Sequence, residues 1–252
     1  MTKRLITLLL ALVPATLLAA GDVKLEASGV NLGDQASLRR GAALYMNYCA
    51  GCHSLQYQRY SRMAEDLNLT EEQVMAHLNF SGRGFGETIT KAMDRDDGEA
   101  WFGKSPPDLS LVSRAKLGGP DWVYTFLTTF YVDESRPAGW NNPVLANASM
   151  PHVLWEMQGV RRAVFEPKPE SGSCAGHEVD GQCLVDFVTV SEGSMSEAEY
   201  QQVARDLSAF LAYVAEPAAL KRQSLGVWAL LFLGILTLLA WLLKTEYCRD
   251  VH

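Results

Sequence analysis

Tandem repeats and low-complexity tracts are missing from this chain of 252 residues, and regular strand alternation is weak throughout. Without alternation of polar and apolar residues a sheet-based fold is not favoured, and a mainly α fold is expected instead. A basic surface is also missing, since acidic residues outnumber Lys and Arg by 29 to 22 and the formal net charge is −7. Nucleic acid is therefore excluded as a partner, whereas a basic protein can be steered toward the chain.

Cysteine and histidine are scarce, with 5 of each. The one closely spaced thiol pair is Cys49 and Cys52, and no second C-x-x-C or spaced His pair completes a zinc site. His53 follows directly and gives C-x-x-C-H, the attachment signature of c-type haem. The two thiols add to the vinyl groups of one porphyrin, and the imidazole binds its iron. We predict one covalent haem c per chain, with a thioredoxin-like dithiol or half a zinc site as the alternatives.

Residues 1–20 are typical of a secretory signal peptide. Lys3 and Arg4 form a short basic region, the apolar run Leu5–Leu18 follows, and small residues close the segment. The alternative is a membrane anchor, but the run contains Pro14 and is short for a spanning helix. Export would place the following domain in an oxidising compartment.

A second apolar run, Leu225–Leu243, contains no charged residue. As a helix it would extend about 28 Å, which is close to the thickness of the hydrocarbon core of a bilayer. Lys221, Arg222 and Lys244 lie near its ends. The alternative is a buried helix of a soluble protein, but no face of the run is polar. We predict one membrane-spanning helix at the C-terminus.

Together the two ends divide the chain into four parts. We expect a signal peptide at 1–20, a periplasmic haem domain at 21–223, a membrane helix at 224–243 and a short cytoplasmic tail at 244–252. The protein is then a single-pass component of a bacterial inner membrane. Lipid is one of its partners, and the haem domain lies on the periplasmic side.

Amphipathic periodicity predicts two principal helices, Gln35–Tyr48 ahead of the haem signature and Glu197–Ala215 near the end of the exported domain. Gly41 in the first helix would allow the second helix to approach closely. Shorter helices are predicted at Thr70–Leu78 and Asp121–Tyr131, and loops at Arg83–Gly103 and Arg136–Ala148. The predicted fold is mainly α, a cytochrome c-like haem domain with long loops plus one C-terminal transmembrane helix.

Two further cysteines, Cys174 and Cys183, lie in Glu166–Asp186, a stretch rich in Gly, Pro and Ser. Nearby thiols in an oxidising compartment tend to pair. A disulfide is therefore predicted between them, with two free thiols as the alternative. Cys248 lies beyond the membrane helix, on the reducing side, and is expected to stay free.

The second axial ligand decides the chemistry of a haem iron, because an open position binds gas or peroxide and a closed one transfers electrons. Met150 is the best candidate, since it lies well downstream of the haem signature and ahead of the last helix of the domain. Pro151 restricts Met150 to an extended backbone. The alternatives are a methionine that fills the core and His152 as the nearest rival ligand. A thioether favours ferrous iron and gives a relatively high potential.

Beyond single motifs, most of the chain resembles the cytochrome c1 family, the haem c subunits of cytochrome bc1 complexes. The likeness is carried by four blocks, which are Ser37–Tyr57 with the haem signature, Ser105–Ser110 with Arg114–Gly119, Asn142–Pro143 with Met150–Pro151, and Met195–Pro217 ahead of the membrane helix. The Pro-Pro-Asp-Leu-Ser sequence of the second block, together with one C-terminal anchor, is far more specific than the haem signature alone.

The resemblance implies a redox subunit of ubiquinol–cytochrome c reductase. In such a complex a Rieske iron–sulfur protein delivers an electron to the haem, and a cytochrome c removes it. Cytochrome b is the implied neighbour of the membrane helix, and the whole complex is implied to be dimeric. No side chain of this chain is expected to perform acid–base catalysis, because the quinol sites belong to other subunits.

The resemblance also implies roles for single residues near the haem. Met150 becomes the sixth ligand of the iron. The Pro107 carbonyl accepts a hydrogen bond from Nδ1–H of His53, which fixes the tautomer of that ring, and Leu109 packs on the haem.

Departures from the family pattern affect the rest of the haem surroundings. Lys116 stands where the family often has an Arg that binds a haem propionate, so Lys116 or Arg114 is expected to take that role, and Trp122 replaces a family Tyr. Two other functions remain open. One is a membrane-anchored cytochrome c of another respiratory complex, and the other is a haem-based sensor with a displaceable ligand.

Overall fold

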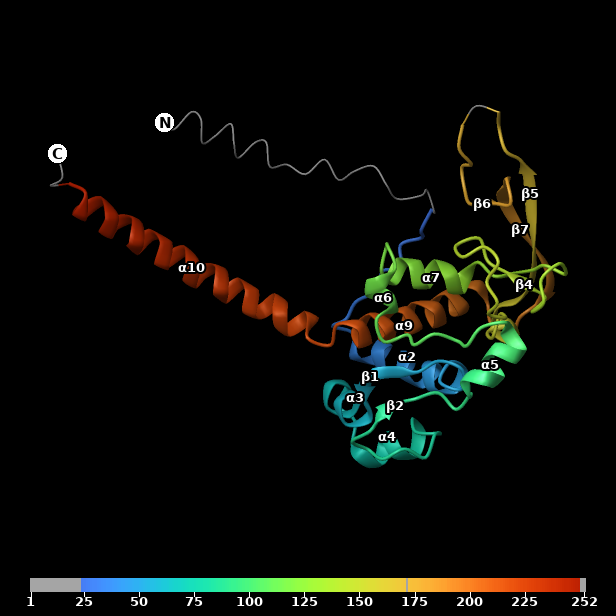
Figure 1. Cartoon of the computed structure of the whole chain (residues 1–252), viewed down its shortest axis with the longest axis horizontal. Coiled ribbons are helices and arrows are strands. Elements are labelled where there is room, and N and C mark those ends of the chain that lie inside the picture. Colours follow the sequence, from blue (N-terminus) through green and yellow to red (C-terminus); the bar gives the residue numbers. More distant parts are fainter. Residues whose placement is uncertain (1–23, 171, 250–252) are drawn as a thin grey trace.

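The computed structural model describes residues 24–170 and 172–249, so the predicted signal peptide lies outside the described residues. Helices dominate the described chain, as predicted, and the longest of them, α10 (Ala219–Tyr247), extends away from the other elements (Figure 1). The remaining helices and strands gather around two long helices, α2 (Gln35–Tyr48) and α9 (Glu197–Ala215). Both of these have the bounds predicted from their amphipathic patterns.

The starts of α2 and α9 are fixed by capping side chains. Asp34 accepts hydrogen bonds from the backbone N–H groups of Ala36 and Ser37 at the start of α2. Ser196 and Glu199 form a reciprocal capping box at the start of α9. Each cap satisfies backbone donors that the first helical turn leaves without a partner. The sequence therefore determines where both helices begin before any tertiary packing is considered.

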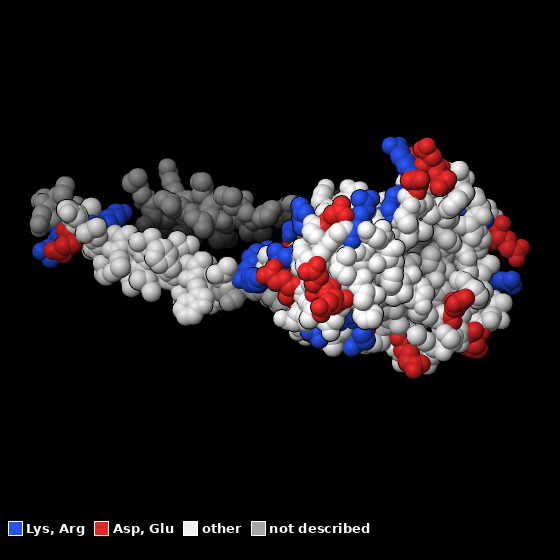
Figure 2. Space-filling view, turned by 90° about the horizontal axis from the view of Figure 1, so that it is seen from below, with Lys and Arg blue, Asp and Glu red and all other residues white. Residues whose placement is uncertain are grey.

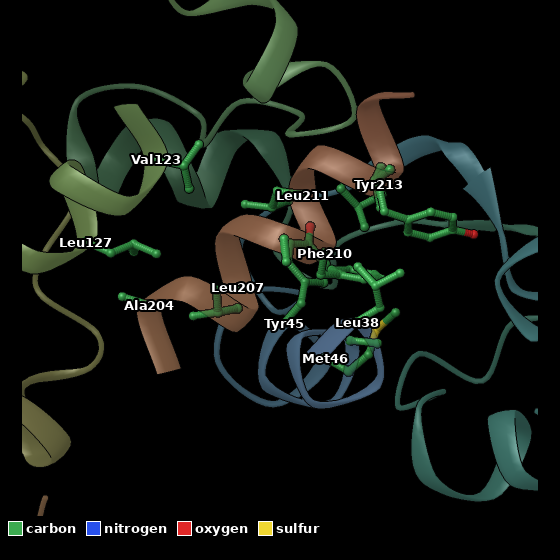
Figure 3. Close-up of a cluster of buried hydrophobic side chains, with 14 of the residues drawn as sticks. Leu38, Tyr45, Met46, Val123, Leu127, Ala204, Leu207, Phe210, Leu211 and Tyr213 are labelled. Carbon is green, nitrogen blue, oxygen red and sulfur yellow. The ribbon is translucent and has the colours of Figure 1, made fainter. Parts of the chain in front are cut away.

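Gly41 lies where α2 and α9 cross. A Cβ atom on Gly41 would lie 2.1 Å from the backbone oxygen of Asp206 and 2.7 Å from Cβ of Phe210, so any side chain here would collide with α9. Tyr45 continues the contact, with its ring centroid 5.7 Å from that of Phe210. Figure 3 shows the facing side chains of α2 and α9, with Leu127 of α7 (Pro120–Thr128) on the opposite side of α9. The core is thus centred on α9.

A buried carboxylate locks this crossing. Asp206 is 2 % exposed and accepts hydrogen bonds from Ser37 Oγ at 2.6 Å, Arg40 Nε at 2.6 Å and Gln202 Nε2 at 2.8 Å. A buried charge without such partners would destabilise the fold. The hydrogen bonds of Asp206 therefore fix the register between the two helices.

Short helices cover the rest of the domain. They are α3 (Tyr60–Leu67), α4 (Glu71–His77), α5 (Arg95–Phe102), α6 (Val112–Ala115) and α8 (Trp155–Gln158). The helix predicted at Thr70–Leu78 corresponds to α4, which Thr70 caps. The helix predicted at Asp121–Tyr131 corresponds to α7, which ends at Thr128 because the chain turns there into strand β3 (Tyr131–Val132).

The prediction of a loop over Arg83–Gly103 was wrong where α5 lies. Asp96 and Asp97 in the first turn favour a helix start, and Gly103 ends the helix in a left-handed conformation with φ 73°. The richness of this stretch in Gly and Asp led to the prediction of a loop, but Gly98 within the helix is a packing residue. A Cβ atom there would lie 2.8 Å from Cδ of Pro106.

The strands form small antiparallel sheets. β1 (Leu55–Arg59) pairs with β2 (Thr88–Ile89), β3 pairs with β4 (Trp140–Asn141), and the third sheet has the order β5-β7-β6, formed by Gly159–Pro167, Gln182–Glu192 and Glu178–Val179. The long β5–β7 hairpin projects at the end of the domain away from α10 (Figure 1). It was not predicted, because irregularities in the pairing at Val160/Arg161 and Val164/Phe165 interrupt the alternation.

A disulfide joins Cys174 to Cys183 at the tip of this hairpin, with their Cα atoms 5.3 Å apart. Cys183 lies in β7 opposite Glu178 of β6, so the disulfide fastens the loop before β6 onto the sheet.

Replacing both Cys174 and Cys183 by serine is expected to lower the free energy of unfolding by about 2–3 kcal/mol at most, because the loop that the disulfide closes is short. We expect faster proteolysis at the hairpin tip, measured by mass spectrometry of limited digests, and an unchanged visible spectrum of the haem. A loss of covalent haem in this variant would contradict a purely local role.

The helix α10 is suited to a bilayer. Within Leu225–Tyr247 a stretch of 18 residues has a mean hydropathy of 2.3, and no part of that stretch is buried against the other residues that the structure describes. This segment begins at the first residue of the predicted apolar run, Leu225–Leu243, and extends to Tyr247. Figure 2 shows an uncharged surface along the projecting rod, with charged residues at its two ends.

Glu216 connects this helix to the domain. It lies in the short joint between α9 and α10, and its carboxylate pairs with Arg114 Nη1 at 2.9 Å on one side and Arg222 Nη2 at 2.9 Å on the other. One pairing group thus belongs to the domain, in α6, and the other to the first turn of α10. Both arginines are largely exposed, so each pair contributes little to stability by itself, but together they orient the joint.

Candidate haem site

The haem signature continues directly from α2. Cys49 caps the helix and donates its N–H to the Tyr45 carbonyl at 2.8 Å, and the His53 N–H bonds the Cys49 carbonyl at 2.8 Å. This tight turn brings Cys49, Cys52 and His53 to the wall of one cavity. Tyr45 holds the turn from inside, because its buried hydroxyl donates to the His53 carbonyl at 2.8 Å. The three groups that attach and ligate a haem are therefore presented together.

His53 is oriented by one backbone oxygen. Its Nδ1 lies 2.7 Å from the Pro107 carbonyl oxygen. A carbonyl can only accept, so Nδ1 carries the proton and Nε2 keeps its lone pair for a metal. Burial lowers the pKa of His53 below its ordinary value, although the bond to Pro107 opposes this shift. The imidazole is thus held neutral, as iron ligation requires.

The loop that carries Pro107 is bonded to the chain that follows His53. Leu109 N–H donates to the Ser54 carbonyl at 2.9 Å. The Asp108 carboxylate accepts from the N–H groups of Gln56 at 2.8 Å and of Ser110 at 2.9 Å. Because these bonds fix the loop, the Pro107 carbonyl keeps its place beside the imidazole. This arrangement explains the local chemistry of the Pro-Pro-Asp-Leu-Ser sequence.

Two adjoining cavities occupy the centre of the site. Their volumes are about 80 and 390 Å³, and both are lined by Cys49, His53, Lys104, Pro107, Ser149 and Met150. Most of the larger wall is apolar and comes from α6, α7, α9 and neighbouring loops, namely Leu109, Val112, Val123, Phe126, Leu127, Leu145, Leu207 and Leu211. A large apolar space with a few polar groups is typical of a cofactor site. Its apolar lining fits a flat, hydrophobic macrocycle.

Met150 lies on the wall of both cavities, as His53 does. Its loop is held from within by two buried asparagines. The Asn142 side chain donates to the Phe126 carbonyl at 2.7 Å and accepts from the Val144 N–H at 2.9 Å, and the Asn141 side chain accepts from the Asn147 N–H at 2.9 Å. The thioether is therefore presented by a fixed backbone rather than by a mobile loop. A neutral imidazole, a thioether and two thiols on one cavity are the donor set that a covalent haem needs.

Comparisons with known proteins agree with this chemistry. The profile of the Cytochrome C1 family matches residues 28–251. The chain is 47% identical, over the full length of both proteins, to cytochrome c1 of Allochromatium vinosum. It is 37% identical to the ammonia monooxygenase gamma subunit of Nitrosomonas europaea, over 97% of each chain, and 29% identical to cytochrome c1 of Rhodospirillum rubrum, over 86% of this chain and 83% of the other.

The chain belongs to the cytochrome c1 family. Like the members of this family it carries covalently bound haem c, and it is a membrane-anchored electron-transfer subunit of the cytochrome bc1 type. The resemblance that the four sequence blocks indicated is thereby confirmed.

The two predicted partners of the haem propionates, Lys116 and Arg114, lie in different places in the structure. Lys116 and Trp122 line the larger cavity, and the Lys116 ammonium lies 4.6 Å from the centroid of the Trp122 ring. Trp122 in turn stacks on Phe126 with ring centroids 5.1 Å apart. Arg114 is not among the residues that line either of these cavities, and its guanidinium pairs with Glu216 instead. This geometry supports Lys116 rather than Arg114 as the propionate partner.

The rival ligand His152 is enclosed by aromatic rings. Its ring stacks on that of Phe130, with centroids 4.9 Å apart and planes at 7° to each other. It meets the Trp140 ring edge-on, with centroids 5.2 Å apart. Burial lowers the pKa of His152 to about 4, so this histidine is neutral at neutral pH. It does not line either of the two cavities described here, in contrast to Met150.

Lys104 and Tyr45 are among the site residues that sequence reasoning missed. Lys104 lines both cavities, and Tyr45 supports the signature turn through its hydroxyl. Tyr45 was correctly placed on the apolar face of its helix, but a pattern of apolar residues carries no information on a hydrogen bond to a specific carbonyl. Lys104 stands alone between Gly103 and Ser105, and no motif marks it.

Proposed function

We propose that this chain accepts single electrons from a Rieske iron–sulfur protein and passes them to a cytochrome c on the periplasmic side of the membrane. Haem c, when bound, supplies reversible one-electron chemistry at its iron. The observation that supports the proposal is the shared cavity, whose wall includes both His53 and Met150, the two proposed axial ligands. With both axial positions taken by the protein, the site suits electron transfer and not substrate binding.

The residues of the chain prepare this transfer in separate ways. His53 is held in one tautomer by Pro107, so it needs no rearrangement when the charge of the iron changes. Met150 supplies a thioether that favours the reduced state. The apolar wall keeps water away from the centre of the site. None of these residues moves a proton, and the quinol chemistry is assigned to other subunits.

The membrane helix supports the proposed assembly. Residues 224–243 would cross the bilayer beside cytochrome b in a dimeric complex, with residues 21–223 exported by the signal peptide at 1–20 and residues 244–252 in the cytoplasm. An apolar helix without any packed face in the chain itself is available for such a neighbour.

Purification of the full-length chain from native membranes in a mild detergent tests the proposal. We expect cytochrome b and a Rieske protein to co-purify, and quinol to reduce the haem within the complex. Removal of the Rieske protein should abolish this reduction, because the iron–sulfur cluster is the proposed donor. Reduction at an undiminished rate without the Rieske protein would overturn the proposal.

A second candidate function comes from the relative named ammonia monooxygenase gamma subunit, which is 37% identical to this chain. This likeness favours an anchored cytochrome c that serves a different membrane complex. The same purification separates the two candidates, since cytochrome b and the Rieske protein would then be missing from the isolated complex. A haem-based sensor would instead be recognised by ready CO binding to the reduced protein at neutral pH.

A further inference from the structure

Lys91 joins three segments that surround the haem signature. It follows strand β2, and its backbone N–H donates to Ser54 Oγ at 2.9 Å, directly after the ligand His53. Its ammonium crosses to the Pro-Pro loop, where it donates to Ser105 Oγ at 2.6 Å and to the Pro106 carbonyl at 3.1 Å. The next residue of that loop is Pro107, whose carbonyl orients the imidazole of His53. Lys91 therefore bonds the residue next to His53 in sequence and also the residue next to Pro107, which orients His53.

The charge of Lys91 is not neutralised by a carboxylate. Both acceptors of its ammonium are neutral oxygens, and among the ion pairs formed within residues 24–170 and 172–249 none includes Lys91. Lys91 is also only partly exposed. A charge in this position is screened less by water than a charge on the open surface.

The electrostatic effect of this ammonium reaches the haem-binding residues. Lys91 bonds the residue that follows His53 and the loop whose Pro107 carbonyl orients the imidazole, so its positive charge belongs to the immediate surroundings of the iron ligand. The ammonium therefore disfavours additional positive charge at this site. Ferric iron carries one more positive charge than ferrous iron, so the same cation disfavours the oxidised haem.

We propose that Lys91 is a positioning residue that raises the reduction potential of the haem, through its unneutralised charge and through its hold on the loop of Pro107. This inference rests on the proposed electron-transfer function, since it concerns how readily the site accepts an electron. It assigns the tuning of the site to a residue outside the four groups that bind the haem. The charge acts on the oxidised state, and the hydrogen bonds act on the orientation of His53.

Potentiometric titration of the haem in the isolated membrane complex tests the proposal. Lys91→Met keeps the apolar stem and removes the charge, and we expect the equilibrium constant for reduction to fall about threefold to tenfold. The upper limit corresponds to a fall of about 59 mV in the midpoint potential. Lys91→Arg keeps the charge and should stay closer to the parent potential than Lys91→Met.

A matched control removes the same charge elsewhere. Lys168 lies directly after β5 on the projecting hairpin and is paired with Glu178 at 2.8 Å. Lys168→Met is expected to leave the midpoint potential unchanged. If Lys91→Met accumulates without haem, Lys91→Gln, which keeps an N–H donor, should show the same fall in potential.

Two results would overturn the proposal. One is an unchanged potential in both Lys91→Met and Lys91→Gln, and the other is an equal fall in Lys91→Met and Lys91→Arg, since the charge would then not be the cause. Failure of the proposed function is recognised separately, because the co-purifying subunits and the reduction by quinol are determined on the parent chain.

Discussion

Replacing Met150 by leucine is expected to open the sixth coordination position of the iron. Leucine fills a similar apolar volume but has no sulfur to donate, so the ferric protein should lose the long-wavelength charge-transfer band of thioether-ligated haem. The ferrous protein should bind CO nearly stoichiometrically at neutral pH, whereas the parent binds none. The midpoint potential should fall, because a thioether favours ferrous iron. Absorption spectra of both oxidation states and a CO titration measure these changes.

Met157 provides the matched control for this experiment. It is 9 % exposed in the core and lines neither of the two cavities described for the site. Met157→Leu should cost less than about 1.5 kcal/mol and leave both spectra unchanged. A charge-transfer band that survives in Met150→Leu would show that another methionine is the ligand. If instead neither the variant nor the parent shows this band and neither binds CO, His152 becomes the candidate.

Replacing Gly41 by alanine is expected to destabilise the domain strongly. On an isolated helix this change would stabilise by about 1 kcal/mol. Here the new Cβ would lie 2.1 Å from a backbone oxygen of α9, and a backbone atom cannot rotate away as a side-chain atom can. Separating the helices would also disturb the hydrogen bonds of Asp206 at the same crossing. We expect the free energy of unfolding to fall by about 3 kcal/mol or more.

Chemical denaturation of the full-length chain in detergent, followed by the haem absorbance, measures this loss. Gly86→Ala is the control, since a Cβ atom on Gly86 meets no atom within 4 Å. Its unfolding free energy should stay within about 1 kcal/mol of the parent value. Equal stability of Gly41→Ala and the parent would mean that α2 and α9 do not cross as closely as described.

Local chemistry explains which elements could be predicted from the sequence. The bounds of α2 and α9 follow from an apolar stripe together with the caps Asp34 and Ser196, which all lie within a few residues of each other. The β5–β7 hairpin escapes such reasoning, since its pairing is irregular and much of it remains exposed. The helix α5 was missed because its stretch is rich in Gly and Asp, although Gly98 lacks a side chain where the helix contacts Pro106.

In the candidate site, too, the residues that could be predicted are those whose placement depends on local sequence. Cys49, Cys52 and His53 are contiguous, so their joint placement follows from the turn that they form themselves. Met150 could be inferred from its position and from Pro151. The contacts of Lys91 cannot be inferred in this manner, because Ser54 lies 37 residues away in sequence and only the β1–β2 pairing brings the two together. Residues that act on the haem through other side chains, such as Lys91, are therefore positioned by the tertiary fold and cannot be found from a local motif.

The short joint at Glu216 has a consequence for the kinetics of the whole assembly. Only Glu216–Ala218 separate α9, which lines the haem cavity, from α10, and the carboxylate bonds both sides. These three residues therefore hold the haem site at a nearly constant distance from the membrane surface. A donor anchored in the same membrane meets it as a neighbour, at an effective concentration that the tether sets, and not as a solute arriving from the bulk.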